Sequence, residues 1–200
     1  MMSKYIVAIS GASGSIYGVG VIRALASAGH TVAVTASREG LSILKDEVGY
    51  DWASGDENET AFKIQTDLHL EMGAVTFHSE DNLYAPISSG SYRTAGMFVA
   101  PCSMKTLAGI ANGYANNLIE RAADVVLKER RPLLLIPRET PLSPIHLENM
   151  LKLSRLGVHI LPAMPGFYNH PKNIQDMVDS IVGRALDLMG IENDLYKRWE

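Results

Sequence analysis

The sequence predicts an α/β protein with a doubly wound parallel sheet, arranged as a flavodoxin- or Rossmann-like three-layer sandwich in a single domain. Short apolar runs alternate with amphipathic stretches along the chain, which is typical of parallel strands separated by helices. The 200 residues are enough for one such core. We expect residues 1–190 to form this domain and residues 191–200 to form a tail that contacts a neighbouring subunit.

The first predicted strand, loop and helix together predict an anion site. Tyr5–Ile9 is apolar and rich in β-branched residues, as expected of a strand buried on both faces. The small residues of the loop 11–18 follow, and Val19–Ala28 is then predicted to be a helix that ends before Gly29. The first N–H groups of a helix lack internal partners and attract negative charge, so this region is suited to a phosphate.

The glycine spacing limits the kinds of phosphate-bearing ligand that this loop could bind. Gly11, Gly14 and Gly18 match neither the dinucleotide-binding fingerprint nor the phosphate-binding P-loop. A NAD site normally has an acidic residue after the second strand, and here Glu39 comes slightly late after Thr31–Thr35. A ligand with a single phosphate, such as FMN, therefore fits better than a dinucleotide. The alternative is a loop that only turns the chain.

Apolar periodicity predicts the remaining elements. Pro101 is expected to stop a strand, and Asn173 with Asp176 to cap the last helix. In chain order, the predicted elements are a helix over Arg38–Val48, an exposed loop over Gly49–Thr66, strands at Ala74–Phe77 and Met97–Ala100, a helix after Cys102, a helix over Asn116–Arg130, a strand at Leu133–Ile136, a helix over His146–Leu156, a strand at His159–Leu161 and a final helix that runs to Met189.

Composition limits the class of protein. The net charge of −4 and the pI near 5.9 argue against a nucleic-acid-binding surface. Cys102 is the only cysteine, so we expect no disulfide framework, and the six histidines show no metal-ligand spacing. Without an apolar run of membrane length or a signal-peptide pattern, a cytoplasmic protein is expected. Charged residues make up 20%, below the roughly 25% of typical soluble proteins, which indicates surface buried between subunits.

Candidate functional groups follow several predicted strands. In a parallel sheet the carboxyl ends of the strands meet at one edge, where ligands bind. The groups expected at this edge are Gly11–Ser15, Ser37, Ser103–Thr106, Arg138–Glu139 and Tyr168. Two of these groups have a purely structural alternative. Ser103 and Thr106 would serve equally well as helix caps, and Arg138–Glu139 as a surface ion pair.

Two further cations lie on predicted helices. Lys128 follows Asp124 by one helical turn, so an ordinary helix ion pair explains it best from spacing alone. Arg184 lies on the flank of an apolar helix stripe, where an arginine is normally solvated unless a phosphate lies near it.

Several motifs occur in order along nearly the full chain, and together they resemble a known family. They are Gly11–Gly14 with Tyr17 and Gly18, Ser88–Ser91, Pro101–Leu107, Arg121–Val125 with Leu127–Glu129, and Pro137–Leu142. In this order they resemble the UbiX-type flavin prenyltransferases. Ile145–Leu151 with Phe167–Pro171 is similar to the branch of this family that accompanies hydroxyarylic (phenolic) acid decarboxylases.

The resemblance implies a reaction and its site. These enzymes transfer a dimethylallyl group from dimethylallyl phosphate to N5 and C6 of reduced FMN without a metal, and a UbiD-type decarboxylase receives the prenylated FMN. By motif, the residues that would hold FMN are Gly11, Ala12, Ser13, Ser37, Ser103, Met104, Lys105, Thr106 and Arg138. Those that would surround the allyl phosphate are Ser89, Gly90, Lys128, Tyr168 and Arg184, and the catalytic residues would be Glu47, Lys128 and Glu139.

The resemblance also implies a homo-oligomer. The family is usually a dodecamer with sites at subunit junctions, so Trp199 is expected to reach a neighbour. The chemistry agrees with these residue types, because apolar and aromatic walls tolerate an allyl cation and cations stabilise a phosphate leaving group. One departure is Tyr92, which stands where the family pattern has Phe and would line the allyl pocket.

Three other functions compete with this interpretation. An FMN-dependent cysteine decarboxylase would share the fold, but its Pro-Ala-Ser-Ala-Asn-Thr motif is replaced here by Pro101–Thr106. A non-catalytic FMN-binding subunit of a decarboxylase complex is a second alternative. The joint presence of Lys128, Glu139, Tyr168 and Arg184 argues against it. A NAD-dependent dehydrogenase is disfavoured by the glycine spacing.

Overall fold

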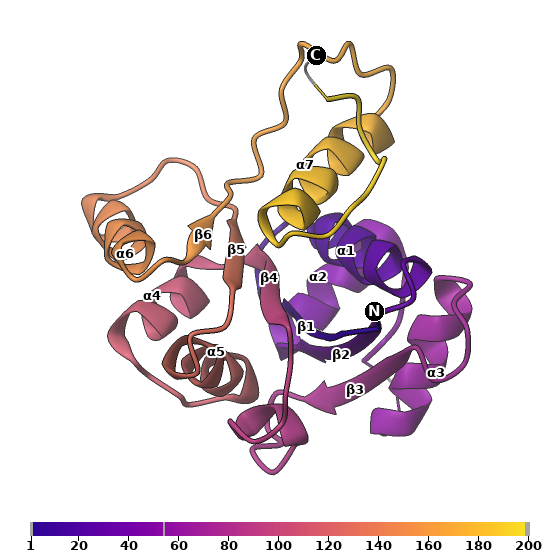
Figure 1. The fold of residues 1–200 in the computed structure, drawn as a ribbon, viewed down its shortest axis with the longest axis vertical. Coiled ribbons are helices and arrows are strands. Elements are labelled where there is room, and N and C mark those ends of the chain that lie inside the picture. The colour runs from indigo at the N-terminus through magenta and orange to yellow at the C-terminus, as the bar shows by residue number, and fades with distance from the viewer. Residues whose placement is uncertain (1, 54, 199–200) are drawn as a thin grey trace.

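The alternating apolar runs form the strands of one parallel sheet. In the computed structural model, which describes residues 2–53 and 55–198, six strands lie in the order β3-β2-β1-β4-β5-β6 (Figure 1). Their bounds are Lys4–Ile9 (β1), Thr31–Ala36 (β2), Val75–Ser79 (β3), Gly96–Cys102 (β4), Leu133–Pro137 (β5) and His159–Ile160 (β6). This is the strand order of a Rossmann fold, and it confirms the predicted doubly wound sheet.

Helices cover both faces of the sheet. Side chains alternate along β1, so that Tyr5 and Val7 face one helical layer while Ile6 and Ala8 face the other. The first layer holds α1 (Ser15–Ser27), α2 (Arg38–Val48), α3 (Glu57–Asp67) and α7 (Ile174–Leu188). The second holds α4 (Met104–Asn112), α5 (Leu118–Lys128) and α6 (Pro144–Arg155), with the short 3₁₀ turn η1 (Pro86–Ser88) packed against α5. Figure 1 shows the two layers on opposite sides of the sheet.

Two glycines let helices approach the strands closely. A Cβ on Gly18 of α1 would collide with the carbonyl oxygen of Ala100 in β4. A Cβ on Gly40 of α2 would lie 2.6 Å from the carbonyl oxygen of Ile9. Because β1 pairs with β2 on one side and with β4 on the other, the helices after these three strands begin at the same edge of the sheet.

The prediction of an exposed loop over Gly49–Thr66 is wrong, because helix α3 begins at Glu57. Asp56 caps this helix by accepting hydrogen bonds from the backbone N–H groups of Asn58 and Glu59, and the Glu59 carboxylate accepts one from the Asp56 N–H. Trp52 lies in the same stretch and is only 1% exposed. The polar composition concealed this capping box, which is the signal that indicates the helix.

Other predicted boundaries also differ. Strand β4 does not stop at Pro101 but runs to Cys102, with an irregular pairing to β5 between Val99 and Cys102 that accommodates a residue without an N–H. Helix α1 begins at Ser15 rather than at Val19, because the loop residue Gly14 takes a left-handed conformation (φ 102°) and already serves as its N-cap.

The residues after α7 fold back along that helix of the same chain. Asn193 donates a hydrogen bond to the carbonyl oxygen of Gly183 (3.2 Å). Trp199 and Glu200 lie outside the described residues, so the contact expected of the tail with a neighbouring subunit stays a prediction. Of the helices in the described ranges, none combines the length and the apolar character needed to cross a membrane.

We predict that Asp56→Ala lowers the free energy of unfolding by about 1 kcal/mol, because two backbone N–H groups of α3 lose their acceptor. Asp56→Asn is the matched control, since asparagine keeps a side-chain oxygen at the N-cap and should stay within a few tenths of a kcal/mol of the parent. Urea unfolding of the three proteins measures the difference. Equal stability of the parent and the alanine variant would contradict the assigned cap.

Candidate active site

The N-terminus of α1 holds a carboxylate of the protein itself. Glu47 of α2 accepts hydrogen bonds through Oε2 from the backbone N–H groups of Gly14 (2.9 Å) and Ser15 (3.0 Å). The sequence predicts an anion at this position, and the anion is the Glu47 side chain. A phosphate that binds to these two N–H groups would first have to displace Glu47.

The same contacts set the ionisation of Glu47. Partial burial alone would raise the pKa of its carboxyl. Hydrogen bonds from the Ser13 side chain and from the N–H groups of Gly14 and Ser15 outweigh burial, so the pKa lies below the ordinary value of 4.5. Glu47 is therefore a carboxylate near neutral pH, the form that can accept a proton, although its lowered pKa makes it a weak base.

Helices α2 and α4 begin beside the end of β1 and are capped by serines. Ser37 accepts a hydrogen bond from the Gly40 N–H (3.0 Å), and Ser103 accepts one from the Thr106 N–H (3.2 Å). The Ser103 N–H in turn donates to the hydroxyl of Ser10 at the end of β1 (2.8 Å). The capping alternative is thus correct for Ser103, and Ser37 has the same role, so that two helix N-termini are oriented toward one edge of the sheet.

This edge fits the phosphate end of a flavin nucleotide. A Cβ on Gly11 would lie 2.8 Å from the Cβ of Glu39, so only a glycine lets the loop pass the start of α2. A backbone hydrogen bond, and then the nearby charge of the Lys105 ammonium, hold the pKa of the Glu39 carboxyl below its ordinary value. Lys105 therefore brings a positive charge close to the start of α2. Two helix N-termini, two hydroxyl-bearing caps and a lysine are the groups that bind a phosphate monoester.

Arg138 lies where two cavities adjoin. One cavity, of about 400 Å³, is lined by Ser13, Gly14, Glu47, Arg138 and the first turns of α7. The other, of about 330 Å³, is lined by Arg138, Glu139, Leu142, Met150 and Met164. Glu47 and Glu139 therefore belong to different cavities that share the same cation. The structure thereby brings together the predicted residues Ser13, Glu47, Arg138 and Glu139.

Lys128 lies at the opposite edge of the sheet. Helix α5 ends at Lys128 and leads into the start of β5, whereas Arg138 follows the end of β5, about 13 Å further along the strand. Gly90 lies beside Lys128, because a Cβ on Gly90 would be 3.0 Å from its Nζ, and Ser89 precedes it. Within one chain, therefore, Lys128, Ser89 and Gly90 form a second group apart from Arg138 and Glu139.

The predicted helix pair between Asp124 and Lys128 is wrong. Lys128 pairs with Glu129 (2.9 Å), and Asp124 pairs with Arg121 (2.9 Å). The reason is that Arg121 also donates to the carbonyl oxygen of Ser88 (3.1 Å), which holds its guanidinium within reach of Asp124.

Arg121 and Arg131 fix the loop that carries Ser89 and Gly90. Arg131 donates to the carbonyl oxygens of Gly90 (2.7 Å) and Tyr92 (2.8 Å), while Arg121 donates to that of Ser88. Figure 1 shows α5 next to the turn between β3 and β4 that contains this loop. The sequence prediction assigns no role to either arginine. Arg121 lies in the motif Arg121–Val125, whereas Arg131, which follows the end of α5, belongs to none of the motifs.

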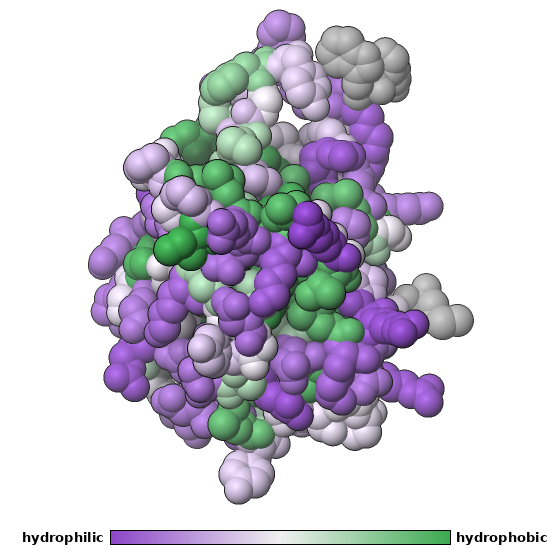
Figure 2. All heavy atoms as spheres, turned by 90° about the vertical axis from the view of Figure 1, so that its left-hand side faces the viewer, coloured by the Kyte–Doolittle hydropathy of each residue, from purple (hydrophilic) through white to green (hydrophobic). Residues whose placement is uncertain are grey.

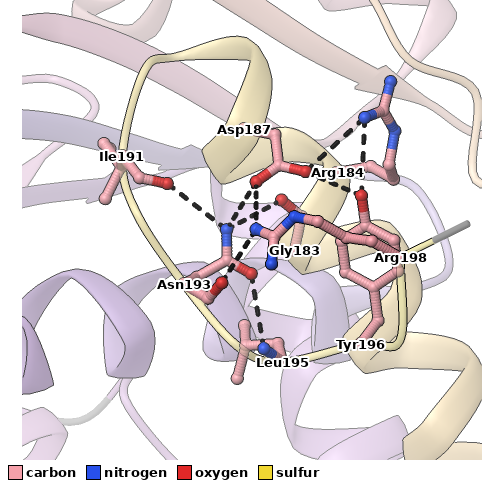
Figure 3. Close-up of polar contacts among 8 residues, drawn as sticks. All are labelled: Gly183, Arg184, Asp187, Ile191, Asn193, Leu195, Tyr196 and Arg198. Carbon is pink, nitrogen blue, oxygen red and sulfur yellow. Dashed lines mark hydrogen bonds and ion pairs between the residues drawn. The ribbon is translucent and has the colours of Figure 1, made fainter. Parts of the chain in front are cut away.

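Tyr168 and Arg184 form a third group near the C-terminus. A hydrogen bond with Tyr196 raises the pKa of Arg184, and the charges of Asp187 and Tyr168 add to this effect. Arg184 lies 3.5 Å from Asp187 and 3.4 Å from the Tyr196 hydroxyl (Figure 3). Arg184 is half exposed, as expected of a residue on the helix flank, but no sequence pattern indicated its contacts with Asp187 and Tyr196. The network around Asp187 is absent from the sequence prediction, because no spacing rule connects α7 to the tail.

The described residues hold no group of three or more His, Cys, Asp and Glu side chains that is arranged to bind a metal ion. Cys102 is fully buried, and burial raises the pKa of its thiol, so this cysteine is not a reactive thiolate.

Comparison with known proteins gives a family and full-length relatives. Residues 2–186 match the flavoprotein family. The flavin prenyltransferase UbiX of Halalkalibacterium halodurans is 47% identical over 195 residues, which cover 98% of this chain and 92% of that protein.

Solved structures agree over the same length. A dodecameric FMN-dependent UbiX-like decarboxylase from Escherichia coli O157:H7 has a TM-score of 0.87 at 44% identity and covers 98% of this chain and 99% of its own. AnUbiX (PadA1) in complex with FMN and dimethylallyl pyrophosphate has a TM-score of 0.89 at 38% identity. The match covers 100% of this chain and 98% of that one. A mutant PPC decarboxylase, at 18% identity and a TM-score of 0.59, shares the fold alone.

We predict that Glu47→Gln lowers the free energy of unfolding by about 1 kcal/mol near pH 7, because the α1 N-terminus loses a negative charge. A carboxyl whose pKa is lowered by folding stabilises the protein above its unfolded pKa, and this contribution is lost as the pH falls through the folded pKa. The difference between parent and variant should therefore shrink as the pH falls below the ordinary value of 4.5 and disappear below the folded pKa of Glu47.

Urea unfolding between neutral and acid pH measures this difference. Asp46→Asn is the control, because it removes the adjacent charge of α2 and leaves the hydrogen bonds to Gly14 and Ser15 in place. A stability loss in Glu47→Gln that is the same at every pH would show that the charge of Glu47 does not stabilise α1.

Proposed function

This chain belongs to the flavoprotein family, among the flavin prenyltransferases of the UbiX type, and from that premise we propose that it transfers a dimethylallyl group from dimethylallyl phosphate to reduced FMN. The observation that carries the proposal is the position of Arg138 between two adjoining cavities, each with one carboxylate. A shared cation with two separated carboxylates suits a reaction of two phosphate-bearing substrates that needs both a proton donor and a proton acceptor.

We propose that FMN binds at the carboxyl edge of β1, β2 and β4. When bound, reduced FMN supplies the nucleophilic N5 and C6 positions. Since Glu47 accepts the α1 N–H groups, the first turns of α2 and α4 are the better phosphate site. The residues proposed to hold FMN are those expected from the sequence: Gly11, Ala12, Ser13, Ser37, Ser103, Met104, Lys105, Thr106 and Arg138.

The allyl phosphate is proposed to bind where groups from more than one subunit meet. Lys128, Ser89 and Gly90 lie at the opposite edge of the sheet from Arg138, so one chain does not bring them to the same substrate. A neighbouring subunit would supply them, and the dodecameric relative provides a precedent for such packing. Tyr168 and Arg184 complete the proposed phosphate site.

The chemistry of the transfer assigns roles to these side chains. The allylic carbon–oxygen bond would break, and phosphate would leave as N5 loses its proton. Closure of the ring would then need one proton added to the allyl double bond and one proton removed from C6. Lys128 and Arg184 offset the negative charge of the departing phosphate, and the Glu139 carboxyl exchanges a proton with this phosphate. Glu47, whose pKa is lowered mainly by hydrogen bonds that outweigh burial, accepts the proton released on ring closure.

An oligomer also agrees with the exposed apolar surface. Figure 2 shows apolar side chains gathered in the upper half of the face that contains α6. Patches of this kind on a globular protein mark interaction sites. The exposed apolar residues of α6 and the adjacent segments include Leu142, Ile145, Leu147, Leu151, Leu156, Met164 and Phe167. We propose a homo-oligomer, a dodecamer like that of the relative.

The product is proposed to pass to a UbiD-type decarboxylase, and a cytoplasmic location remains a prediction. A non-catalytic FMN-binding subunit is the second candidate function. It is disfavoured by the two carboxylates at the cavities, because binding of FMN alone has no use for a second acid–base group.

We predict that Glu139→Gln slows prenylation by about 10²–10⁴-fold while FMN still binds, because glutamine keeps the shape but cannot exchange a proton. The measurement is single-turnover formation of prenylated FMN from reduced FMN and dimethylallyl phosphate without oxygen, followed by mass spectrometry of the released flavin. An FMN titration of each protein is the binding control.

The matched control is Glu71→Gln, which makes the same change in the exposed turn between α3 and β3. If the parent protein forms no prenylated FMN, the proposed function is wrong. If the parent is active and Glu139→Gln is equally fast, Glu139 has only a structural role. Loss of FMN from this variant would mean that Glu139 belongs to the flavin site.

A further inference from the structure

Asp187, near the end of α7, accepts hydrogen bonds from four side chains, one of the same helix and three of the tail that follows it (Figure 3). Three of these bonds are short: Tyr196 at 2.7 Å, Arg198 at 2.8 Å and Asn193 at 2.9 Å. The fourth, from Arg184, is 3.5 Å long. A carboxylate has about four acceptor positions, so the tail residues take the best of them and leave Arg184 with the weakest.

The tail is fitted closely to α7 at this point. A Cβ on Gly183 would collide with the ring of Tyr196, so glycine is required for the ring to lie against the helix. Arg198 also lies over the same ring, 5.5 Å from its centroid, and donates to the carbonyl oxygen of Asn193 (2.8 Å). The position of Arg198 is therefore set by three separate contacts.

The charges of this network leave one cation in excess. Asp187 is 20% exposed and lies between two guanidinium groups, those of Arg184 and Arg198. Because Arg198 makes the shorter ion pair, it offsets most of the Asp187 charge. Arg184 then keeps its positive charge for another anion. Without Arg198, Asp187 would pair more strongly with Arg184, which already lies 3.5 Å from it.

We propose that Arg198 is a positioning residue for the allyl phosphate: it holds Asp187 away from Arg184, so that Arg184 can bind the phosphate. This inference rests on the proposed function, which places Arg184 at the allyl phosphate. It predicts that Arg198 affects the binding of this substrate without contacting it, and that its effect depends on the charge of Asp187.

The test is calorimetric titration of dimethylallyl phosphate into the protein loaded with oxidised FMN. Because the proposed reaction needs reduced FMN, this titration measures binding without turnover. Arg198→Ala should weaken binding about ten-fold, and Arg198→Lys should restore most of the affinity. The decisive variant is Asp187→Asn combined with Arg198→Ala. Because asparagine no longer attracts Arg184, this double variant should recover most of the affinity that Arg198→Ala loses, and FMN affinity should stay unchanged throughout.

Two results would overturn the inference. Unchanged binding by Arg198→Ala would show that Arg198 does not influence Arg184. A double variant that binds as weakly as Arg198→Ala, or more weakly, would show that the network only anchors the tail. Failure of the proposed function is a separate outcome, because then the parent protein itself would not bind dimethylallyl phosphate and Arg184→Ala would change nothing.

Discussion

The parallel direction of the strands is the constraint on which the site depends. Every strand that leads into a helix does so at the same edge, so the helix N-termini and the residues that cap them gather there. Ser37 and Ser103 come from positions far apart in the sequence, yet both cap helices that begin beside β1. Gly18 and Gly40 permit this convergence, because any side chain at either position would collide with a strand.

The same constraint places residues at the C-terminal ends of the helices at the opposite edge of the sheet, away from the residues that follow the strands. Lys128 ends α5 and lies one strand length from Arg138, although only nine positions in the sequence separate them. A single subunit thus carries the edge proposed to bind FMN and, on its far side, Lys128 beside a loop that Arg121 and Arg131 hold in place. Oligomerisation is then part of the proposed catalytic site, because one subunit completes the edge of another.

Local patterns predicted most of the fold, since apolar runs such as Leu133–Ile136 determine strands directly. Helix α3 was missed because its polar residues outweighed one capping box at Asp56. Contacts between distant segments could not be predicted. The bonds from Gly14 and Ser15 to Glu47 join residues more than thirty positions apart, and nothing in the sequence shows that Glu47 lies across the N-terminus of α1. The Asp187 network depends in the same way on how the tail returns to α7.

The central claim, a site shared between subunits, is tested most directly by complementation of two inactive variants. Arg138→Ala removes the cation at the flavin edge, and Lys128→Ala removes the cation at the opposite edge. When the two variants are co-expressed in equal amounts, random assembly should place an intact Arg138 and an intact Lys128 together in about a quarter of the sites. A shared site should give about that fraction of the parent prenylation rate, with hybrid oligomers confirmed by native mass spectrometry. Hybrid oligomers without any recovered activity would contradict it.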